Sequence, residues 1–186
     1  MTRIIAGAAR GRRLLTPAGS RTRPTSDRVR EALFSALESE LGAFAGLRVL
    51  DLYAGSGALG LEALSRGAAH VLLIETDVRA VRTIRSNVAT VGLPGAQVVQ
   101  SSVGRALAAA PSLPYDLVVA DPPYAMPGDE IEPVLDQLTK GWLAPQAVVV
   151  VERSTRDAPL RWPAGLTALR IRRYGETMLW YGRPAG

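Results

Sequence analysis

The sequence predicts an α/β protein built on one seven-stranded, mostly parallel sheet that ends in an antiparallel hairpin. Apolar runs of strand length alternate with stretches of helical periodicity through most of the chain, which is typical of a doubly wound sheet. The run at 146–152 is almost wholly apolar, as expected for a strand covered on both faces. Only Gly175-Glu176 separates the last two runs, and so short a link predicts a hairpin rather than a crossover helix.

The expected elements begin with a β-hairpin whose strands cover residues 3–7 and 12–16. A helix then starts at Thr25 or Ser26, either of which can cap it, and continues to residue 41. The elements that build the sheet and its helices follow in this order: strand 48–53, helix 58–66, strand 70–75, helix 77–91, strand 96–100, helix 103–110, strand 115–120, helix 129–140, strand 146–152, and the hairpin strands 166–174 and 177–182.

The composition narrows the classes of protein and site that the chain can form. It has 186 residues, enough for one domain with a sizeable core, and no cysteine, which excludes disulfides, cysteine nucleophiles and thiolate metal sites. His70 is its only histidine, so a histidine-rich cluster is excluded as well and no metal is expected. No run of about 18 apolar residues occurs, and the apolar part of the N-terminus is too short for a signal peptide. We therefore expect a soluble cytoplasmic protein.

Positive charge is concentrated at the start of the chain. Residues 1–30 hold eight arginines and one acid, a net charge of +7, whereas the other residues hold 14 cations and 16 acids, a net charge of −2. A genome rich in G and C explains the preference for arginine over lysine but not this clustering. Arginine suits phosphate, and basic arms commonly bind nucleic acid; a hairpin packed on the sheet with solvated arginines is the alternative. We divide the chain into a basic arm, 1–25, and a main domain, 26–186, and expect nucleic-acid contacts from Arg3, Arg10, Arg12, Arg13, Arg21 and Arg23.

A glycine-rich turn follows the strand at 48–53 and predicts a cofactor site. Gly55, Gly57 and Gly60 satisfy the pattern G-x-G-x-x-G, in which glycines let the backbone approach a ligand at a helix N-terminus. Glu75 lies 20 residues after Gly55, at the end of the next strand, where it is placed to bind ribose hydroxyls. These features alone leave NAD as a candidate.

Asp51, near the end of the same strand, favours a different cofactor. A carboxylate beside the turn is unfavourable for a pyrophosphate but favourable for a ligand that carries an ammonium group. S-adenosylmethionine has a methionine ammonium, a ribose and an adenine, and no phosphate. The pattern D-x-x-x-G-x-G with a following acid is typical of the methyltransferases that use it. The predicted cofactor site comprises Asp51, Tyr53, Ala54, Gly55, Gly57 and Glu75, with Ser102 added because adenine usually lies after the third strand.

Asp121-Pro122-Pro123-Tyr124 is the most informative short motif of the chain. It follows the apolar strand 115–120, which the two prolines end. In open α/β sheets ligands bind at the carboxyl ends of the strands, so the motif is placed at the ligand edge. Asp121 and the Pro122 carbonyl can accept hydrogen bonds from an exocyclic amine of a nucleobase, and the Tyr124 ring can stack on the base. We expect catalytic roles for these three residues, with a strand-ending turn as the alternative.

Several segments match a family pattern that runs over nearly the whole chain. They are Arg3 to Gly7, Arg10 to Arg12, Arg23 to Thr25, Asp27 to Phe34, Asp51 to Gly57 and Asp121 to Tyr124, with similarity continuing to Thr177. Together they resemble the RsmD family of bacterial 16S ribosomal RNA guanine-N2 methyltransferases. The short, proline-bearing segment between 152 and 166 indicates that the usual last helix is missing.

The resemblance implies a Rossmann-like class I methyltransferase fold with an N-terminal hairpin extension and S-adenosylmethionine as the cofactor. It implies methyl transfer to N2 of one guanine, usually numbered 966, in the 16S rRNA of the small ribosomal subunit or its assembly intermediate. Asp121, Pro122 and Tyr124 then hold the base, and the arm contacts the RNA.

Three other functions remain open. An amino methyltransferase acting on adenine in DNA fits Asp121 to Tyr124 equally well, and only the basic arm and the family pattern favour rRNA. A nicotinamide-dependent oxidoreductase fits Gly55 to Gly60 but gives Asp51 and the Asp-Pro-Pro-Tyr motif no role. A non-enzymatic RNA-binding assembly factor with a retained cofactor fold is disfavoured by the intact Asp121.

Overall fold

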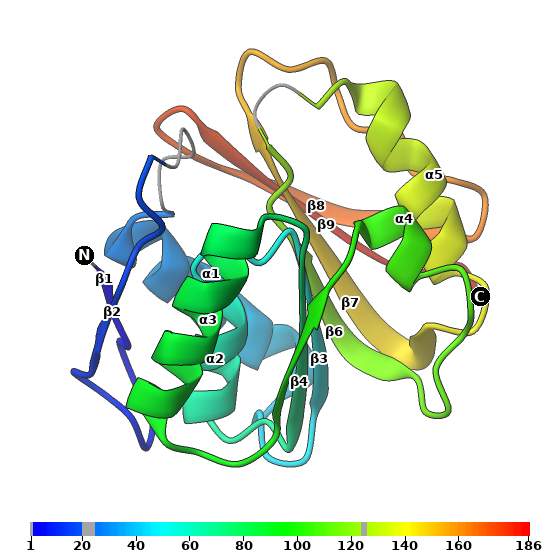
Figure 1. Cartoon of the computed structure of the whole chain (residues 1–186). Helices are drawn as coiled ribbons and strands as arrows, with labels where there is room; N and C mark the ends of the chain where they lie inside the picture. The colour runs from blue at the N-terminus through cyan, green and yellow to red at the C-terminus, as the bar shows by residue number, and fades with distance from the viewer. Residues whose placement is uncertain (1, 20–24, 124–125) are drawn as a thin grey trace.

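The computed structural model describes residues 2–19, 25–123 and 126–186, and its centre is a seven-stranded sheet with helices on both faces (Figure 1). The strand order is β5-β4-β3-β6-β7-β9-β8. The pairs from β5 to β7 are parallel, and β9 pairs antiparallel with both β7 and β8. The predicted fold class, with its C-terminal antiparallel hairpin and N-terminal hairpin, is confirmed.

The elements of the sheet lie close to their predicted positions. The strands are β3 (Arg48–Leu52), β4 (His70–Glu75), β5 (Ala96–Gln100), β6 (Tyr115–Ala120), β7 (Leu143–Ser154), β8 (Leu166–Tyr174) and β9 (Thr177–Pro184). The helices are α1 (Asp27–Leu41), α2 (Ala58–Ser65), α3 (Val78–Val91), α4 (Val103–Ala106) and α5 (Gly128–Leu138). None of the helices in the described part of the chain is long and apolar enough to cross a bilayer.

Two elements of the sheet and its helices differ from the prediction by three or more residues at one end; the others differ by at most two. β7 begins at Leu143 rather than 146. The helix predicted over 103–110 ends at Ala106, because the next turn tightens: the N–H of Ala108 donates to the carbonyl of Arg105, three residues back.

Alternate residues of the central strands face opposite layers of helices. Val49 and Val119 pack in one core cluster with α1, α2 and α3, whereas Leu50 and Val118 pack in another with α4 and α5. Both faces of the parallel strands are therefore covered, as their apolar sequences predict.

The N-terminal hairpin is less regular than predicted. β1 (Thr2–Arg3) and β2 (Arg13–Leu14) have two residues each, where the sequence pattern predicts strands over 3–7 and 12–16. The backbone N–H groups of Ile5 and Ala6 donate to the carboxylate of Glu62 on α2, at 2.9 and 3.0 Å. The side chain of Glu62, which is distant in sequence, thus replaces some of the backbone hydrogen bonds expected between the two strands of the hairpin.

The hairpin packs on the same core as the sheet. Ile4, Ala9 and Leu14 are buried in the cluster that contains α1, α2 and α3. The hydroxyl of Ser65 on α2 accepts a hydrogen bond from the backbone of Ala9 at 2.9 Å. Gly7 has a φ of +83°, and an added Cβ there would lie 1.9 Å from the Ser65 carbonyl oxygen. Only glycine allows this close approach of the hairpin to α2.

Asn87 on α3 fixes the chain where it leaves the hairpin. This buried amide accepts a hydrogen bond from the backbone N–H of Leu15 at 2.8 Å and donates to the Leu15 carbonyl at 2.9 Å. It also donates to the carbonyl of Ser56, in the glycine-rich turn, at 2.8 Å. One side chain therefore ties the hairpin to that turn.

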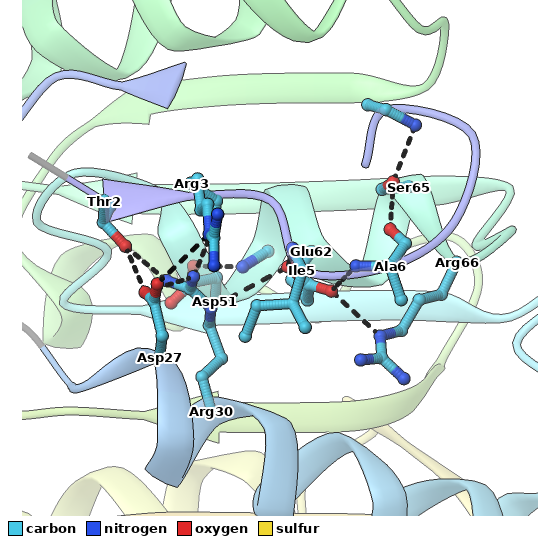
Figure 2. A network of polar contacts seen from close by, with 12 residues as sticks. Thr2, Arg3, Ile5, Ala6, Asp27, Arg30, Asp51, Glu62, Ser65 and Arg66 are labelled. Carbon is cyan, nitrogen blue, oxygen red and sulfur yellow. Dashed lines mark hydrogen bonds and ion pairs between the residues drawn. The ribbon is translucent and has the colours of Figure 1, made fainter. Parts of the chain in front are cut away.

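A buried ionic network joins the hairpin to α1 and α2 (Figure 2). Arg30 and Glu62 are both buried, and Arg30 Nε lies 3.8 Å from Glu62 Oε2. The Arg30 guanidinium also donates to the Thr2 hydroxyl at 3.0 Å, to the Asp27 carboxylate at 3.1 Å and to the Arg3 carbonyl. Because neither central charge reaches water, each depends on these partners for compensation.

Replacing Glu62 by glutamine should lower the free energy of unfolding by about 3–5 kcal/mol, because the change removes the buried carboxylate that pairs with both Arg30 and Arg66 and leaves Arg30 with Asp27 as its only carboxylate partner among the described residues. Equilibrium denaturation in urea measures this loss. Glu38→Gln is the matched control, since Glu38 also pairs with an arginine, Arg66 at 2.9 Å, but its side chain is 50% exposed. The control should lose no more than about 1 kcal/mol, and equal losses in the two variants would contradict the role given to burial.

Candidate active site

A cavity of about 390 Å³ opens at the carboxyl ends of β3 and β4. Asp51 and Gly55 line it from β3 and the following turn, Glu75 from the end of β4, and Asp121 from the end of β6. This volume is within the range of small-molecule sites. The structure therefore brings together predicted cofactor residues and the first residue of the Asp-Pro-Pro-Tyr motif.

The glycine-rich turn has a backbone shape that few residues other than glycine adopt. Tyr53, Gly55 and Gly57 have φ values of 57°, 60° and 80°. Tyr53 and Ala54 line the cavity, as predicted. Gly57 is not among the described lining residues, and a Cβ added to it would lie 3.2 Å from the side chain of Leu73 and 3.4 Å from that of Ile84, in the core. Gly57 therefore shapes the turn on the side that packs against the core.

Both carboxylate oxygens of Glu75 accept hydrogen bonds from the backbone. Oε2 accepts from Gly55 at 2.8 Å, and Oε1 accepts from Thr76 and Asp77 at 2.8 and 2.9 Å. These bonds fix the carboxylate in the cavity wall, and the remaining lone pairs can accept hydroxyl groups. The position suits the ribose contact predicted for Glu75.

Asp51 lies beneath the turn and is 1% exposed. Its Oδ2 accepts from the N–H of Gly60 at 2.8 Å, and a Cβ on Gly60 would lie 3.0 Å from this oxygen, which accounts for the third glycine. Burial raises the pKa of Asp51 to about 8; the Gly60 bond opposes this shift and the charge of Glu75 adds to it. A cation bound in the cavity would favour the ionised form.

Ser102 follows β5, as the sequence predicts, but it also has a structural role. It is the N-cap of α4, and its hydroxyl accepts from the N–H of Arg105 at 3.4 Å. It is not among the described residues that line the cavity. A capping serine and a ligand-binding serine look alike in sequence.

The cavity also has walls that sequence reasoning missed. Residues 16–19, Thr25 and Arg30 line it, although they precede β3. No motif marks these residues as ligand contacts. Residues 16–19 reach the cavity because the hairpin docks on α2 and α3, whereas Arg30 reaches it from α1 and Thr25 from the residue before the N-cap of α1.

Asp121 stands at the junction of two cavities. It borders the large cavity together with Pro123, and with Pro122 and Glu152 it borders a small cavity of about 10 Å³ beside β7. Burial raises the pKa of Asp121 well above its usual value, and the charges of Glu152 and Asp51 raise it further. Tyr124 lies outside the described residues, so its stacking role stays a prediction.

Arg12 has a contact within the protein that its sequence does not predict. Its guanidinium donates to the carbonyls of Thr90, at 3.1 Å, and Val91, at the C-terminal end of α3. Cations at this end of a helix are favourable, and the bond ties the hairpin to α3. Arg12 therefore serves the fold, whatever contact it makes with RNA.

The other arginines of the arm have different surroundings. Arg10 and Arg13 are exposed. Arg3 lies 3.7 Å from the Asp27 carboxylate and is 69% exposed. The predicted contacts Arg21 and Arg23 lie outside the described residues. Next to β2, helix α3 adds exposed cations that sequence reasoning missed: Arg79, Arg82 and Arg85.

The fold and the cavity together define a class of protein. The chain has a seven-stranded sheet of this order, a glycine-rich turn after β3, an acid that ends β4, and Asp-Pro-Pro after β6. These are the features of a Rossmann-like class I methyltransferase, and the cofactor of that class is S-adenosylmethionine.

The sequence pattern of the family described as Conserved hypothetical protein 95 matches residues 2–183, and the chain belongs to this family, the RsmD family. Ribosomal RNA small subunit methyltransferase D of Escherichia coli (strain K12) is 39% identical over 175 residues, covering 94% of this chain and 85% of the relative. Putative rRNA methyltransferase YlbH of Bacillus subtilis (strain 168) is 36% identical over 179 residues, covering 94% and 95%. A solved structure, the putative methyltransferase yhhF from Escherichia coli, superposes with a TM-score of 0.83 at 36% identity, covering 98% and 97%.

The raised pKa of Asp51 predicts that binding of S-adenosylmethionine releases a proton. At about pH 6.5 an Asp51 with a pKa of about 8 is mainly protonated, and the ammonium of the cofactor favours its ionised form. Calorimetric titration in buffers of different ionisation enthalpy measures the number of protons released. Asp51→Asn should reduce that number by nearly one.

Asp116→Asn is the control for this experiment, because Asp116 accepts from the backbone of Arg48, away from the cavity, and should leave the proton count unchanged. The raised pKa of Asp51 also affects the stability of the free protein. As pH rises, Asp51 ionises in the unfolded chain before it ionises in the folded protein, so the free energy of unfolding falls between about pH 4 and about pH 8. In Asp51→Asn the free energy of unfolding should depend less on pH over this range. The assignment is wrong if Asp51→Asn releases as many protons as the wild type.

Proposed function

We propose that this chain transfers a methyl group from S-adenosylmethionine to the exocyclic N2 of a guanine in the 16S rRNA of the small ribosomal subunit, at the position usually numbered 966. The observation that carries the proposal is the place of Asp121, between the large cavity at β3 and β4 and the small cavity beside β7. A base amine held by Asp121 faces a cofactor bound in the large cavity. Relatives whose names are rRNA methyltransferases support RNA as the substrate.

The N2 lone pair of guanine is conjugated with the ring, so the amine is a weak nucleophile. The main contribution of the protein to the reaction is therefore to orient this amine. Asp121 accepts a hydrogen bond from one amine hydrogen and the Pro122 carbonyl from the other, which turns the lone pair toward the cavity. S-adenosylmethionine supplies the methyl group: the N–C bond forms as the S–C bond breaks, and sulfur keeps the electron pair. Methylation makes the amine proton far more acidic. Asp121, whose pKa is raised by burial, is suited to receive that proton.

The base must leave its stack in the RNA to reach Asp121, because a paired or stacked guanine cannot insert its amine between two protein groups. Stacking on Tyr124, outside the described residues, would stabilise the extruded base. Exposed Arg10 and Arg13 of the arm, with Arg82 and Arg85 of α3, give the RNA phosphates flanking that base a basic surface. Ribosomal particles in the cytoplasm are therefore the expected partner.

The proposal is tested by incubating the protein with labelled S-adenosylmethionine and small-subunit particles that lack the modification, and by mapping the methylated base. We expect one methyl group on N2 of one guanine in 16S rRNA. Label on adenine N6, or on DNA but not on the particles, would replace the proposal with another amino methyltransferase activity.

Asp121→Ala should lower turnover on these particles by at least about 100-fold, since the amine loses the group that orients it. Affinity for S-adenosylmethionine should stay nearly unchanged, because Asp121 meets the base rather than the ribose. Asp129→Asn, on the exposed first turn of α5, is the matched control and should behave as the wild type. Wild-type turnover by Asp121→Ala would rule out the role given to this carboxylate.

Changing Arg10 and Arg13 together to alanine should weaken binding to the particles and flatten the plot of log affinity against log salt by roughly one unit for each phosphate that is no longer neutralised. Arg12 is left in place because it holds α3. The control is the double change of Lys140 and Arg183, which are exposed cations at the opposite, amino edge of the sheet: Lys140 precedes β7, and Arg183 pairs with Thr167 at the start of β8. Equal slopes in the two double variants would assign Arg10 and Arg13 to the solvated surface.

A further inference from the structure

Glu152 is a second carboxylate beside Asp121, and sequence reasoning gives it no role. It follows Val151 on β7, and Val151 pairs with Ala120 on β6, so Asp121 and Glu152 are neighbours across two parallel strands. Both residues line the small cavity, together with Pro122. This cavity adjoins the place where Asp121 and the Pro122 carbonyl would hold the target amine.

Thr25 fixes the orientation of Glu152. The Thr25 hydroxyl donates to Glu152 Oε2 at 2.7 Å. Among the described residues, no other group donates a hydrogen bond to Glu152, so its other oxygen, Oε1, can accept from a ligand. Burial raises the pKa of Glu152, although the Thr25 bond opposes this, and the charge of Glu152 raises the pKa of Asp121. A ligand that offers two adjacent hydrogen-bond donors would stabilise the two neighbouring carboxylates against their mutual repulsion.

Guanine offers such a pair of donors. Its Watson–Crick edge carries the N1–H group next to the N2 amine, and both point in the same direction. Adenine carries an acceptor, the bare N1, next to its N6 amine. A carboxylate beside the amine site therefore attracts guanine and repels adenine, whereas Asp121 and the Pro122 carbonyl accept an amine from either base.

We propose that Glu152 selects guanine over other amino-bearing bases by accepting a hydrogen bond from N1–H while Asp121 holds the N2 amine. This inference rests on the proposed methyl transfer to a nucleobase and names the group that chooses the base. Glu152 acts on specificity: it touches the base but not the methyl group or the cofactor cavity. Thr25 positions it, which links base choice to the segment that joins the arm to α1.

The test uses particles reconstituted with either guanine or 2-aminopurine at the target position. 2-Aminopurine keeps the exocyclic 2-amine but has a bare N1 acceptor in place of N1–H. The wild type should prefer guanine, by kcat/KM, by about 10- to 100-fold, as expected for one hydrogen bond to a charged group. Glu152→Gln should narrow this preference by at least about tenfold, because the amide of glutamine can donate to the bare N1. Glu152→Ala should lose activity on guanine by a similar factor.

Affinity for S-adenosylmethionine is measured in each variant and should not change in Glu152→Gln, because Glu152 is not among the described residues that line the large cavity and glutamine keeps an oxygen for the hydroxyl of Thr25, which does line it. Glu132→Gln is the matched control; Glu132 lies on α5, where it pairs with Arg161 at 3.7 Å, and should keep the wild-type preference. A Glu152→Gln variant that loses activity equally on both bases, or keeps the wild-type preference, overturns the inference and assigns Glu152 to anchoring Thr25. A wild type that places no methyl group on guanine N2 overturns the proposed function itself, which is a separate readout.

Discussion

Neighbouring parallel strands carry acidic side chains at one edge of the sheet, and the site is arranged around this cluster of carboxyl groups. In the order β4, β3, β6, β7 the acids are Glu75, Asp51, Asp121 and Glu152, brought side by side by the parallel register. Burial raises the pKa of three of them, Asp51, Asp121 and Glu152, and the charges of neighbouring acids raise the pKa of Asp51 and Asp121 further. The protein offsets this with donors from Gly60, Gly55 and Thr25. The carboxyl oxygens can accept further hydrogen bonds, so the edge favours ligands rich in N–H and O–H groups. It is unfavourable for phosphate, and in this respect it differs from a dinucleotide-binding site.

The sequence predicts best those features that local rules determine. Strand length, glycine spacing and the two prolines placed the sheet, the turn at Gly55 and the ligand-edge position of Asp121 correctly. It leaves open which of several roles a residue takes. Ser102 caps a helix through a partner three residues away, and a capping serine resembles a ligand contact in sequence, whereas Gly57 packs against the core and Arg12 binds the end of α3 through partners distant in the chain. Residues 16–19 become a cavity wall only through docking.

The N-terminal segment combines two kinds of residue. One set faces inward and belongs to the fold: Ile4, Ala9 and Leu14 fill the core beside α1, α2 and α3. The other set faces outward and carries exposed charge, with Arg10 and Arg13 as its described members. Because the same backbone carries both, the basic surface is held at a fixed place relative to the site, through Asn87 and the turn at Ser56. A flexible basic tail would also bind phosphate, but it would not hold the RNA backbone at a fixed position relative to the site.

The contact between the hairpin and Glu62 has a consequence for the order of events during synthesis. Ile5 emerges from the ribosome 57 residues before its partner on α2, which at cellular elongation rates is roughly 3–11 s. During that interval two strands of two residues each have little backbone pairing to hold them together. The hairpin is made before α2 and therefore becomes ordered only after α2 has formed. Since this segment also supplies a wall of the large cavity, the nascent chain should acquire its affinity for cofactor late, in the same step that covers Glu62.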